Sequence, residues 1–200
     1  MDRNVRIKRH QNQNFTDIMG SGVSIKSFDY EKIYSEEYLR WLRDPEVLLT
    51  LNLTSYLEKP IDVDEVEQYC RALIESENNI FCAVHERNTD LFIGTCKIGG
   101  INEFSGIADV GIMIGEKRLW GRGIGSETVS LLSNYAFNEL SLRKLTGGAM
   151  SSNKSMLNIF ARLGFVEEGV LRKQDRVGST FIDHVLFGCF RDEFKPLLKC

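Results

Sequence analysis

The sequence predicts an α+β fold in which helices flank one mixed, mostly antiparallel central sheet. Two observations carry this prediction. Three strand-like segments in the middle of the chain follow one another through short turns, as in a meander, whereas later strand-like segments alternate with amphipathic helices. Turns join antiparallel neighbours and helical crossovers join parallel ones, so both kinds of pairing are expected in a single sheet.

The expected elements follow the hydrophobic pattern along the chain. Strands are expected where apolar residues alternate or form short runs, and helices where they recur every three or four positions. Asp44 and Pro45 are expected to stop the first helix, and Asp62 to cap the second. The predicted order is a strand over 23–28, helices over 35–43 and 62–76, strands over 80–85, 92–99 and 107–114, a helix over 124–140, a strand over 145–150, a helix over 153–163, and strands over 165–172 and 181–190.

The chain divides into a polar N-terminal extension, residues 1–22, and one domain over residues 23–200. The extension ends in a Gly-Ser-Gly run and is interpreted as a flexible arm, with a strand or a partner-binding arm as the alternative. A length of 200 residues is normal for one domain with a short extension.

Composition narrows the class of protein. Twenty-five Lys and Arg against 28 Asp and Glu give a net charge of −3, without the basic excess of a nucleic-acid-binding surface. The five cysteines show no close pairing typical of a metal or redox site, which fits a reducing compartment. No signal peptide or bilayer-spanning apolar run is evident. We therefore expect a cytoplasmic protein that binds no metal, nucleic acid or membrane.

A glycine-rich turn is the most informative stretch of the sequence. The strand over 107–114 leads into residues 120–126, with the letters WGRGIGS, and a helix follows directly. Glycines at alternate positions leave backbone N–H groups uncovered, and a helix N-terminus adds unpaired donors and positive potential. The turn is therefore either a tight connection or a pocket for phosphate groups. Arg118 and Arg122 can add charge-assisted hydrogen bonds to such an anion.

The spacing of the glycines distinguishes among the known kinds of phosphate-binding loop. A Walker A loop is excluded because no Gly-Lys-Ser/Thr closes the motif. A dinucleotide fingerprint is disfavoured, because the spacing is G-x-G-x-G and the next strand-like segment, 145–153, contains no Asp or Glu. The remaining anion is a coenzyme diphosphate of the CoA type.

At these residues the sequence resembles the GCN5-related N-acetyltransferase (GNAT) superfamily. Its acetyl-CoA loop has the pattern Q/R-x-x-G-x-G/A, and here Trp stands in the Q/R place. The following Ser-Glu pair is similar to the RimJ/RimL-type branch, which acetylates ribosomal-protein N-termini and includes acetyltransferases of small amines. Three further segments match that branch in order: WLRDPEV over 41–47, the asparagine-led helix that ends in LGF at 163–165, and FIDHVLFG over 181–188.

The resemblance implies the GNAT fold, with a V-shaped opening between central strands, and acetyl-CoA as the acetyl donor. Backbone groups near Ile112–Ile114 are then expected to bind pantetheine and polarise the thioester, and Asn153 to bind the pantetheine arm or cap its helix. Trp41 and Arg43 are expected on the acceptor side. The expected coenzyme contacts are Ile112, Met113, Ile114, Trp120, Gly121, Arg122, Gly123, Ile124, Gly125, Ser126, Asn153 and Phe160.

Two departures from the family pattern concern the thiolate that leaves. Met156 stands where the branch has a serine, although Ser155 is adjacent, and Phe160 stands where many relatives have a tyrosine. Ser155 is therefore the expected proton donor to the thiolate. Because both usual donors are absent or shifted, a non-catalytic acyl-CoA-binding or regulatory module on the same fold is the alternative function.

Asp109 is the expected general base. Alternation over 107–114 places Asp109, Gly111 and Met113 on one face of their strand, beside the glycine-rich turn. An exposed aspartate is a weak base, so burial must raise its pKa for this role. Glu127 is the runner-up, although a helix-capping role suits it better. His184 could also take a proton, but a lone histidine on an apolar strand is more often a core residue.

The expected reaction is direct attack of a primary amine on the thioester within a ternary complex. No cysteine lies in a sequence context typical of a catalytic nucleophile, so no acetyl-enzyme intermediate is expected. The acceptor is a small molecule, such as an amino sugar, or a protein N-terminus. The last strand has an exposed edge, so a homodimer is also expected.

Overall fold

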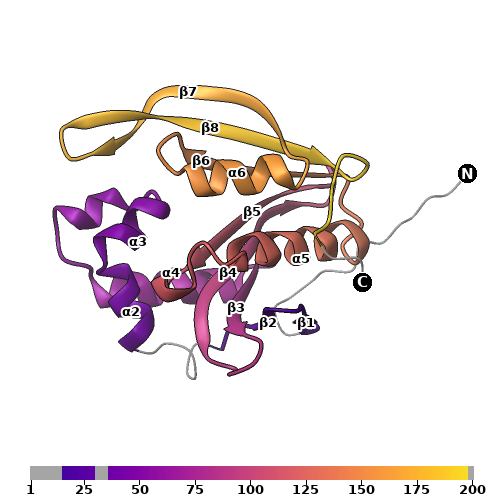
Figure 1. Ribbon diagram of the computed structural model, residues 1–200, viewed down its shortest axis with the longest axis horizontal. Coiled ribbons are helices and arrows are strands. Elements are labelled where there is room, and N and C mark those ends of the chain that lie inside the picture. The colour runs from indigo at the N-terminus through magenta and orange to yellow at the C-terminus, as the bar shows by residue number, and fades with distance from the viewer. Residues whose placement is uncertain (1–14, 30–35, 198–200) are drawn as a thin grey trace, which may run out of the picture.

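The computed structural model describes residues 15–29 and 36–197. The basic residues near the N-terminus and Cys200 lie outside these ranges. Eight strands form one sheet in the order β1-β2-β3-β4-β5-β6-β8-β7 (Figure 1). The strands are β1 (Ile18–Met19), β2 (Val23–Ser27), β3 (Ile80–Glu86), β4 (Phe92–Asn102), β5 (Ile107–Ile114), β6 (Lys144–Met150), β7 (Val166–Val177) and β8 (Thr180–Phe190).

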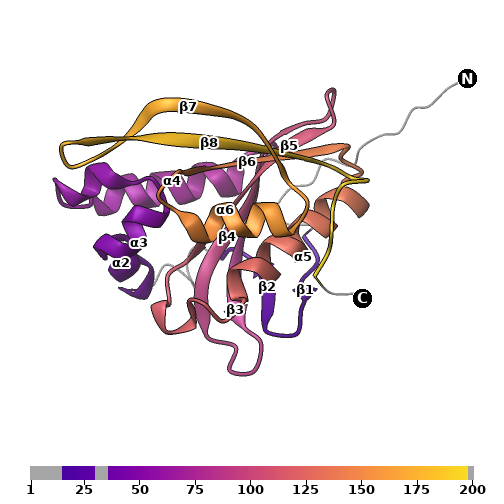
Figure 2. The ribbon, with the colours of Figure 1, turned by 45° about the horizontal axis from the view of Figure 1, so that its top comes forward.

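The helices lie on the two faces of this sheet. They are α2 (Glu36–Leu42), α3 (Pro45–Thr50), α4 (Val63–Glu75), α5 (Ile124–Asn138) and α6 (Lys154–Arg162), with 3₁₀ turns η2 (Thr54–Leu57) and η3 (Lys117–Leu119). The helices α2, α3 and α4 gather on one side, and α5 and α6 on the other (Figures 1 and 2). The predicted α+β class and mixed, mostly antiparallel sheet are confirmed, because among the strands of the described residues only β5 and β6 pair in parallel.

Two hydrophobic clusters hold the helices to the sheet. One cluster joins α5 and α6 to the face of β5 that carries Ala108 and Val110. The other joins α2 and α4 to the opposite face, through Phe81 of β3 and Met113 of β5. Alternate residues of β5 therefore belong to opposite cores, as strand geometry requires. The predicted alternation along β5 is present.

One predicted boundary is wrong in an instructive way. Asp44 and Pro45 do end α2, but they also begin a second helix, α3, that the sequence reading did not include. The Asp44 carboxylate accepts a hydrogen bond from the N–H of Glu46 at 3.0 Å. Pro45 occupies the first turn, where it needs no N–H donor. The same pair is thus a stop signal for one helix and a start signal for the next.

The end of the predicted extension also differs from a flexible arm. Ile18 and Met19 pair with β2, so residues 18–19 form an edge strand of the sheet. Ser21 and Gly22 bind Glu127 on α5 through hydrogen bonds of 2.5–3.1 Å. This part of the segment is therefore hydrogen-bonded to β2 and α5, as the strand alternative implied, and residues 1–14 lie outside the described part of the chain.

The strand β7 is longer than the hydrophobic pattern predicts, whereas β8 differs from its prediction by one residue. Strand β7 continues to Val177 instead of ending at residue 172. Its distal half pairs only with β8 and is largely exposed, so it carries no apolar alternation. The tip of this hairpin reaches the α3–η2 segment, where Thr54 donates a 2.5 Å hydrogen bond to the carbonyl of Arg176 (Figure 1).

Candidate active site

The sheet opens between its two parallel strands. Strands β5 and β6 pair over three rungs only, the last of which joins Asp109 and Thr146. Beyond this rung β5 continues to Ile114 and β6 to Met150. A cavity of about 1280 Å³ lies in the resulting V and is lined by residues from both faces of the sheet. Asp109 therefore lies where the V closes.

The glycine-rich turn lines one side of this cavity. Gly121 and Gly123 have φ angles of +74° and +84°, which strongly favour glycine, and nothing lies within 4 Å of where a Cβ would stand. Glu127 provides the first bonded amide of α5, which donates to the carbonyl of Gly123 at 2.9 Å. The amides of residues 124–126 precede it, so they are open donors in the described chain. This arrangement fits a diphosphate.

Two side chains hold this turn against the sheet. The Trp120 indole N–H donates to the carbonyl of Ile114 at 2.7 Å, which ties the turn to the end of β5. Leu119 is 3% exposed and packs in the α5-side core. The tryptophan in the Q/R place of the family pattern thus has a local structural role.

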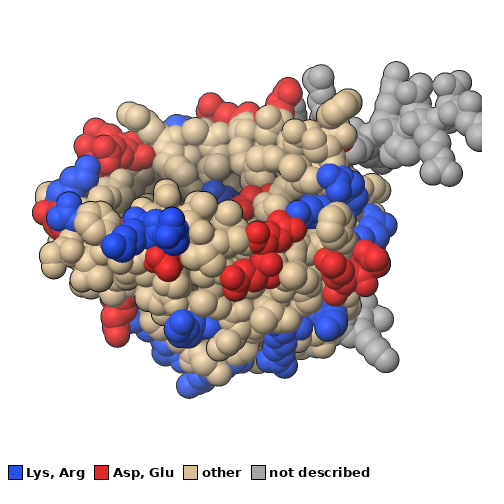
Figure 3. Space-filling model, turned by 90° about the horizontal axis from the view of Figure 1, so that it is seen from above, with Lys and Arg blue, Asp and Glu red and all other residues tan. Residues whose placement is uncertain are grey.

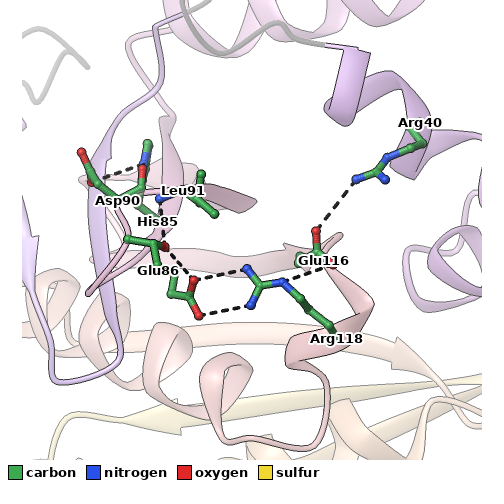
Figure 4. A network of polar contacts seen from close by, with 8 residues as sticks. Arg40, His85, Glu86, Asp90, Leu91, Glu116 and Arg118 are labelled. Atoms are coloured by element: carbon green, nitrogen blue, oxygen red, sulfur yellow. Dashed lines mark hydrogen bonds and ion pairs between the residues drawn. The ribbon is translucent and has the colours of Figure 1, made fainter.

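The two arginines expected to help bind an anion do not line the cavity. Arg118 instead pairs with Glu86, at 3.2 Å between Nη2 and Oε2, and lies close to Glu116, which also approaches Arg40 (Figure 4). The hydrogen bond from Arg118 lowers the pKa of Glu86. Arg122 is exposed beside the turn. A diphosphate at this turn would therefore meet mainly backbone donors.

The start of α6 lines the cavity near the same turn. The Asn153 side-chain oxygen accepts from the N–H of Met156 at 3.1 Å, so Asn153 caps α6. Its amide nitrogen donates to the carbonyl of Thr50 at 3.2 Å and so links α6 to α3. Ser155 is exposed and also lines the cavity.

Three predicted site residues lie elsewhere. Phe160 is 0% exposed and packs against Gly147, where an added Cβ would lie 2.3 Å from the ring. Trp41 is 3% exposed and packs in the same way against Gly115. Arg43 is exposed and is not among the residues that line the cavity. Both aromatic rings fill space left by a glycine, so Phe160 and Trp41 are core residues.

Asp109 lines the cavity, but the surrounding protein removes much of the water around its carboxyl group. Burial by the surrounding protein raises its pKa, although the side chain still reaches the cavity. The charge of Lys97 and a 3.3 Å hydrogen bond from Thr146 partly offset this rise. The pKa shift has the direction that a general base requires.

The Glu127 carboxylate has a structural role. Its carboxylate accepts from the backbone N–H of Ser21 at 2.5 Å and from the Ser21 hydroxyl at 3.0 Å. The Gly22 N–H reaches both of its oxygens, at 3.0 and 3.1 Å. Glu127 therefore fastens the N-terminal strand segment to the first turn of α5, the helix that begins at the glycine-rich turn.

A histidine with a long-range hydrogen-bond partner also lies on the cavity wall. His184 on β8 lines the cavity, and its Nδ1 lies 2.7 Å from Oδ2 of Asp175 on β7. The other oxygen of Asp175 accepts from the side-chain amide of Asn52 at 2.8 Å. Asn52 and Asp175 are 123 positions apart, so no local pattern could reveal this contact.

Residues 15–29 and 36–197 contain no group of three or more His, Cys, Asp or Glu that could hold a metal ion. None of the helices in these ranges is both long and apolar enough to cross a bilayer. Lys, Arg, Asp and Glu are interspersed on the face shown in Figure 3.

The chain matches known acetyltransferases in sequence and in fold. Residues 27–166 match the family described as Acetyltransferase (GNAT) domain. The chain is 28% identical over 151 residues to the uncharacterized N-acetyltransferase p20 of Bacillus licheniformis, a match that covers 76% of this chain and 84% of the relative.

Two solved structures show the same fold. Spermidine N-acetyltransferase from Vibrio cholerae, in complex with CoA and spermine, has a TM-score of 0.74 at 18% identity, covering 87% of this chain and 98% of that one. A GCN5-related N-acetyltransferase from Brucella melitensis has a TM-score of 0.71 at 21% identity, covering 90% and 85%. With the family match over well over half of the chain, these findings lead to one conclusion: the chain belongs to the GNAT family and is an acetyl-CoA-dependent N-acetyltransferase.

Proposed function

We propose that this enzyme transfers the acetyl group of acetyl-CoA directly to a primary amine held on the opposite face of the V. The observation that carries the proposal is the lining of one cavity from both faces of the sheet. Residues of the glycine-rich turn line it on the α5 side, and Asp109 and Met113 line it on the α4 side. Two substrates can therefore meet at the same strands without a covalent enzyme intermediate.

The coenzyme is proposed to occupy the α5 side. Open amides at residues 124–126, with Gly121 and Gly123, would hold the diphosphate. The pantetheine arm would follow β5 at Ile112–Ile114, whose backbone faces the V instead of a neighbouring β6 strand. Ser155, exposed at the start of α6, is proposed to supply the proton to the departing thiolate.

The acceptor is proposed to be a cationic primary amine on the α4 side. Tyr38, Tyr56 and Tyr69 line this part of the cavity together with the carboxylates of Glu65 and Asp109. Aromatic faces and carboxylates both attract ammonium groups. The Vibrio cholerae protein with spermine bound is consistent with such an acceptor. A protein N-terminus, as in the RimJ/RimL-type branch, and an amino sugar have the same amine chemistry.

Asp109 is proposed to face the acceptor nitrogen. Its carboxylate attracts the ammonium group and takes the proton that must leave before the nitrogen can attack. Because the pKa of Asp109 is raised, proton transfer to it is more favourable than transfer to an ordinary aspartate. Removal of the carboxylate charge by Asp109→Asn should slow acetyl transfer by about 10²–10⁴. The loss should shrink at high pH, where the amine is already neutral.

An acceptor screen tests the function. The enzyme is incubated with acetyl-CoA and spermine, glucosamine or a short peptide with a free N-terminus, and free thiol is measured. Amine-dependent thiol release with formation of an acetylated product supports the proposal. Calorimetric binding of CoA without thiol release for any amine would favour the non-catalytic acyl-CoA-binding module.

We also propose a cytoplasmic location and a homodimer. Strand β7 lies at one edge of the sheet, and Val166, Val170 and Leu171 on it are 54%, 43% and 42% exposed. Apolar side chains on an edge strand favour association with another copy. Light scattering coupled to size-exclusion chromatography tests the dimer, and a monomer at micromolar concentration would contradict it.

A further inference from the structure

The Asn52–Asp175–His184 chain of hydrogen bonds defines which nitrogen of the histidine is basic. The Asp175 side chain is 5% exposed and that of His184 is 20% exposed. A carboxylate can only accept hydrogen bonds, so the Asp175 contact at 2.7 Å places the imidazole proton on Nδ1. The lone pair then lies on Nε2, which has no hydrogen-bond partner in the described residues.

This nitrogen lies in the open part of the V. A Cβ added at Gly148 would stand 2.5 Å from Nε2 of His184, so the ring reaches across β6 at a residue that has no side chain. Gly148 and His184 line the same cavity as Asp109. Gly148 lies two residues beyond Thr146, the partner of Asp109 in the last rung of the V. His184 and Asp109 thus line neighbouring parts of one wall.

The hydrogen-bond chain is costly for a purely structural feature. A buried carboxylate loses hydration, and here both of its oxygens need partners from other elements, Asn52 and His184. Buried polar pairs of this kind are rarely better for stability than apolar packing. They are, in contrast, a common way to fix the orientation and tautomer of a catalytic imidazole.

Resting on the proposed acetyl transfer, we propose that His184 is a second catalytic residue, which accepts at Nε2 the proton that the acceptor nitrogen releases during attack. An alkylammonium loses two protons on its way to an amide. The first leaves before attack, and Asp109 is proposed to take it. The second leaves as the N–C bond forms and the C–S bond breaks, with the bonding pair departing on sulfur as thiolate. Asp175 and Asn52 are positioning residues.

The charges around His184 suit this role. Asp175 faces Nδ1 from β7, and Asp109 lies on β5 close enough for the two groups to interact electrostatically. Lys97 of β4 and Glu168 of β7 also line the cavity, whereas the lining residues of β6 are uncharged. The Asp175 carboxylate at Nδ1 therefore stabilises the imidazolium that forms when Nε2 takes the proton.

Rates measured across pH separate the two proton acceptors. Spermine is the probe amine, and kcat and both KM values are compared for wild type, His184→Gln and Asp109→Asn. We expect His184→Gln to lower kcat by about 10²–10⁴ with little change in KM for acetyl-CoA. Its defect should persist at high pH, because the second proton is released only during attack, whereas the Asp109→Asn defect should shrink. Imidazole added to a His184→Ala variant should restore part of the rate.

A spectroscopic measurement tests the geometry without turnover. Nitrogen-15 NMR of the imidazole rings, with His184→Gln to assign the signal, should show the Nδ1-protonated tautomer in wild type. Asp175→Asn should shift that tautomer balance and lower kcat while leaving coenzyme affinity unchanged.

The outcomes distinguish this inference from the proposed function. If wild type acetylates no amine, the proposed function fails and this inference fails with it. If wild type is active but His184→Gln retains its rate and pH profile, or if His184 is protonated on Nε2, only the role of His184 is overturned. A fall in both folding stability and coenzyme affinity for His184→Gln and Asp175→Asn alike would show a structural pair.

Discussion

Gly123 and Gly178 both have a left-handed backbone conformation, but only Gly123 lies at the cavity. Both have positive φ angles, +84° and +58°, and nothing lies within 4 Å of an added Cβ at either position. Gly123 immediately precedes α5 in the turn that lines the cavity, whereas Gly178 lies in the β7–β8 turn. A comparison between them can separate conformational cost from loss of coenzyme binding.

We predict that Gly123→Ala and Gly178→Ala each lower the free energy of unfolding by about 1 kcal/mol, the cost of a left-handed alanine. Only Gly123→Ala should weaken coenzyme binding, by about tenfold or more, because its methyl group stands beside the open amides. Urea unfolding and calorimetry with CoA measure the two effects. Equal CoA affinity for the two folded variants would show that the turn does not bind the diphosphate.

Asp109 allows a second prediction at the residue scale. Its pKa is raised by burial above the ordinary value of 3.8, so the folded state holds the proton more tightly than the unfolded state does. The carboxylate therefore lowers stability at neutral pH, and this penalty disappears as pH falls through the raised pKa towards 3.8. Asp109→Asn should unfold at the same or higher urea concentration than wild type at pH 7. A less stable variant at pH 7 would identify Asp109 as a structural residue.

Individual site residues differ in whether a local sequence pattern can predict their position. Asp109 could be predicted to face the cleft because strand alternation is local information, and the structure places it on the cavity wall. The hydrogen-bond chain of His184 could not be predicted, because Asp175 and Asn52 become neighbours only when β7 folds over the η2 segment. Trp41 and Phe160 were predicted in the site, but both rings are buried and pack where Gly115 and Gly147 have no side chain, which no local pattern reveals.

At the scale of elements, α3 depends on two contacts of one carboxylate. Asp44 caps the helix through the N–H of Glu46, and its Oδ2 lies 2.7 Å from Nζ of Lys117 in η3. The Lys117 hydrogen bond lowers the pKa of Asp44, more than the cap itself does. Asp44 therefore joins α3 to the segment that precedes the glycine-rich turn.

We predict that Asp44→Ala lowers the free energy of unfolding by about 1 kcal/mol at pH 7, the usual cost of losing an N-cap. Because the folded pKa of Asp44 is depressed, its contribution is present above the ordinary value of 3.8 and is lost as pH falls through the folded pKa. Asp44→Asn is the matched control, since it keeps a capping oxygen but no charge. Identical unfolding curves for wild type and Asp44→Ala at pH 7 would contradict the prediction.

The clamp between Glu127 and the N-terminal segment yields another prediction. Glu127→Ala removes the acceptor of the Ser21 and Gly22 amides, so these amides should exchange with solvent at least about tenfold faster, the factor that corresponds to 1.4 kcal/mol. Hydrogen exchange followed by NMR measures this. Amides in the middle of α5, such as that of Leu132, serve as the internal control. Unchanged exchange at Ser21 and Gly22 would show that β1 is held by strand pairing alone.

Helices and strands differ in how clearly the sequence pattern predicts them. The helix α5 and the strands β3, β4 and β5 were predicted within a few residues because their apolar pattern is continuous. The helix α3 was missed because six residues give less than two turns of periodicity. The strand β1 has two residues and no period at all, and its place depends on pairing with β2 and on Glu127.

At the scale of the molecule, the sheet consists of two parts joined by a short parallel seam. Strands β1–β5 form one part and β6–β8 the other, and only three residue pairs connect β5 with β6. Helix α5 packs on β5 and lies close to β6, so it supports the seam from one face. A ligand that fills the V contacts both parts at once.

We predict that CoA stabilises the folded protein strongly. A ligand at about 100 times its Kd adds about 2.7 kcal/mol to the free energy of unfolding. For a chain of this size, this corresponds to a rise in Tm of about 5–10 °C. Differential scanning fluorimetry with and without CoA measures the shift, and Gly123→Ala is the control that should show a smaller one. A Tm that does not depend on CoA concentration would contradict coenzyme binding in the V.

The lining of the cavity from both faces has a consequence for steady-state kinetics. If the donor enters along the α5 side and the acceptor along the α4 side, neither molecule obstructs the path of the other. The enzyme should then follow a random-order mechanism, with either substrate able to bind first and either product able to leave first. A conjugate that joins CoA to the amine through the acetyl carbon would occupy both paths together, and it should compete with each substrate separately.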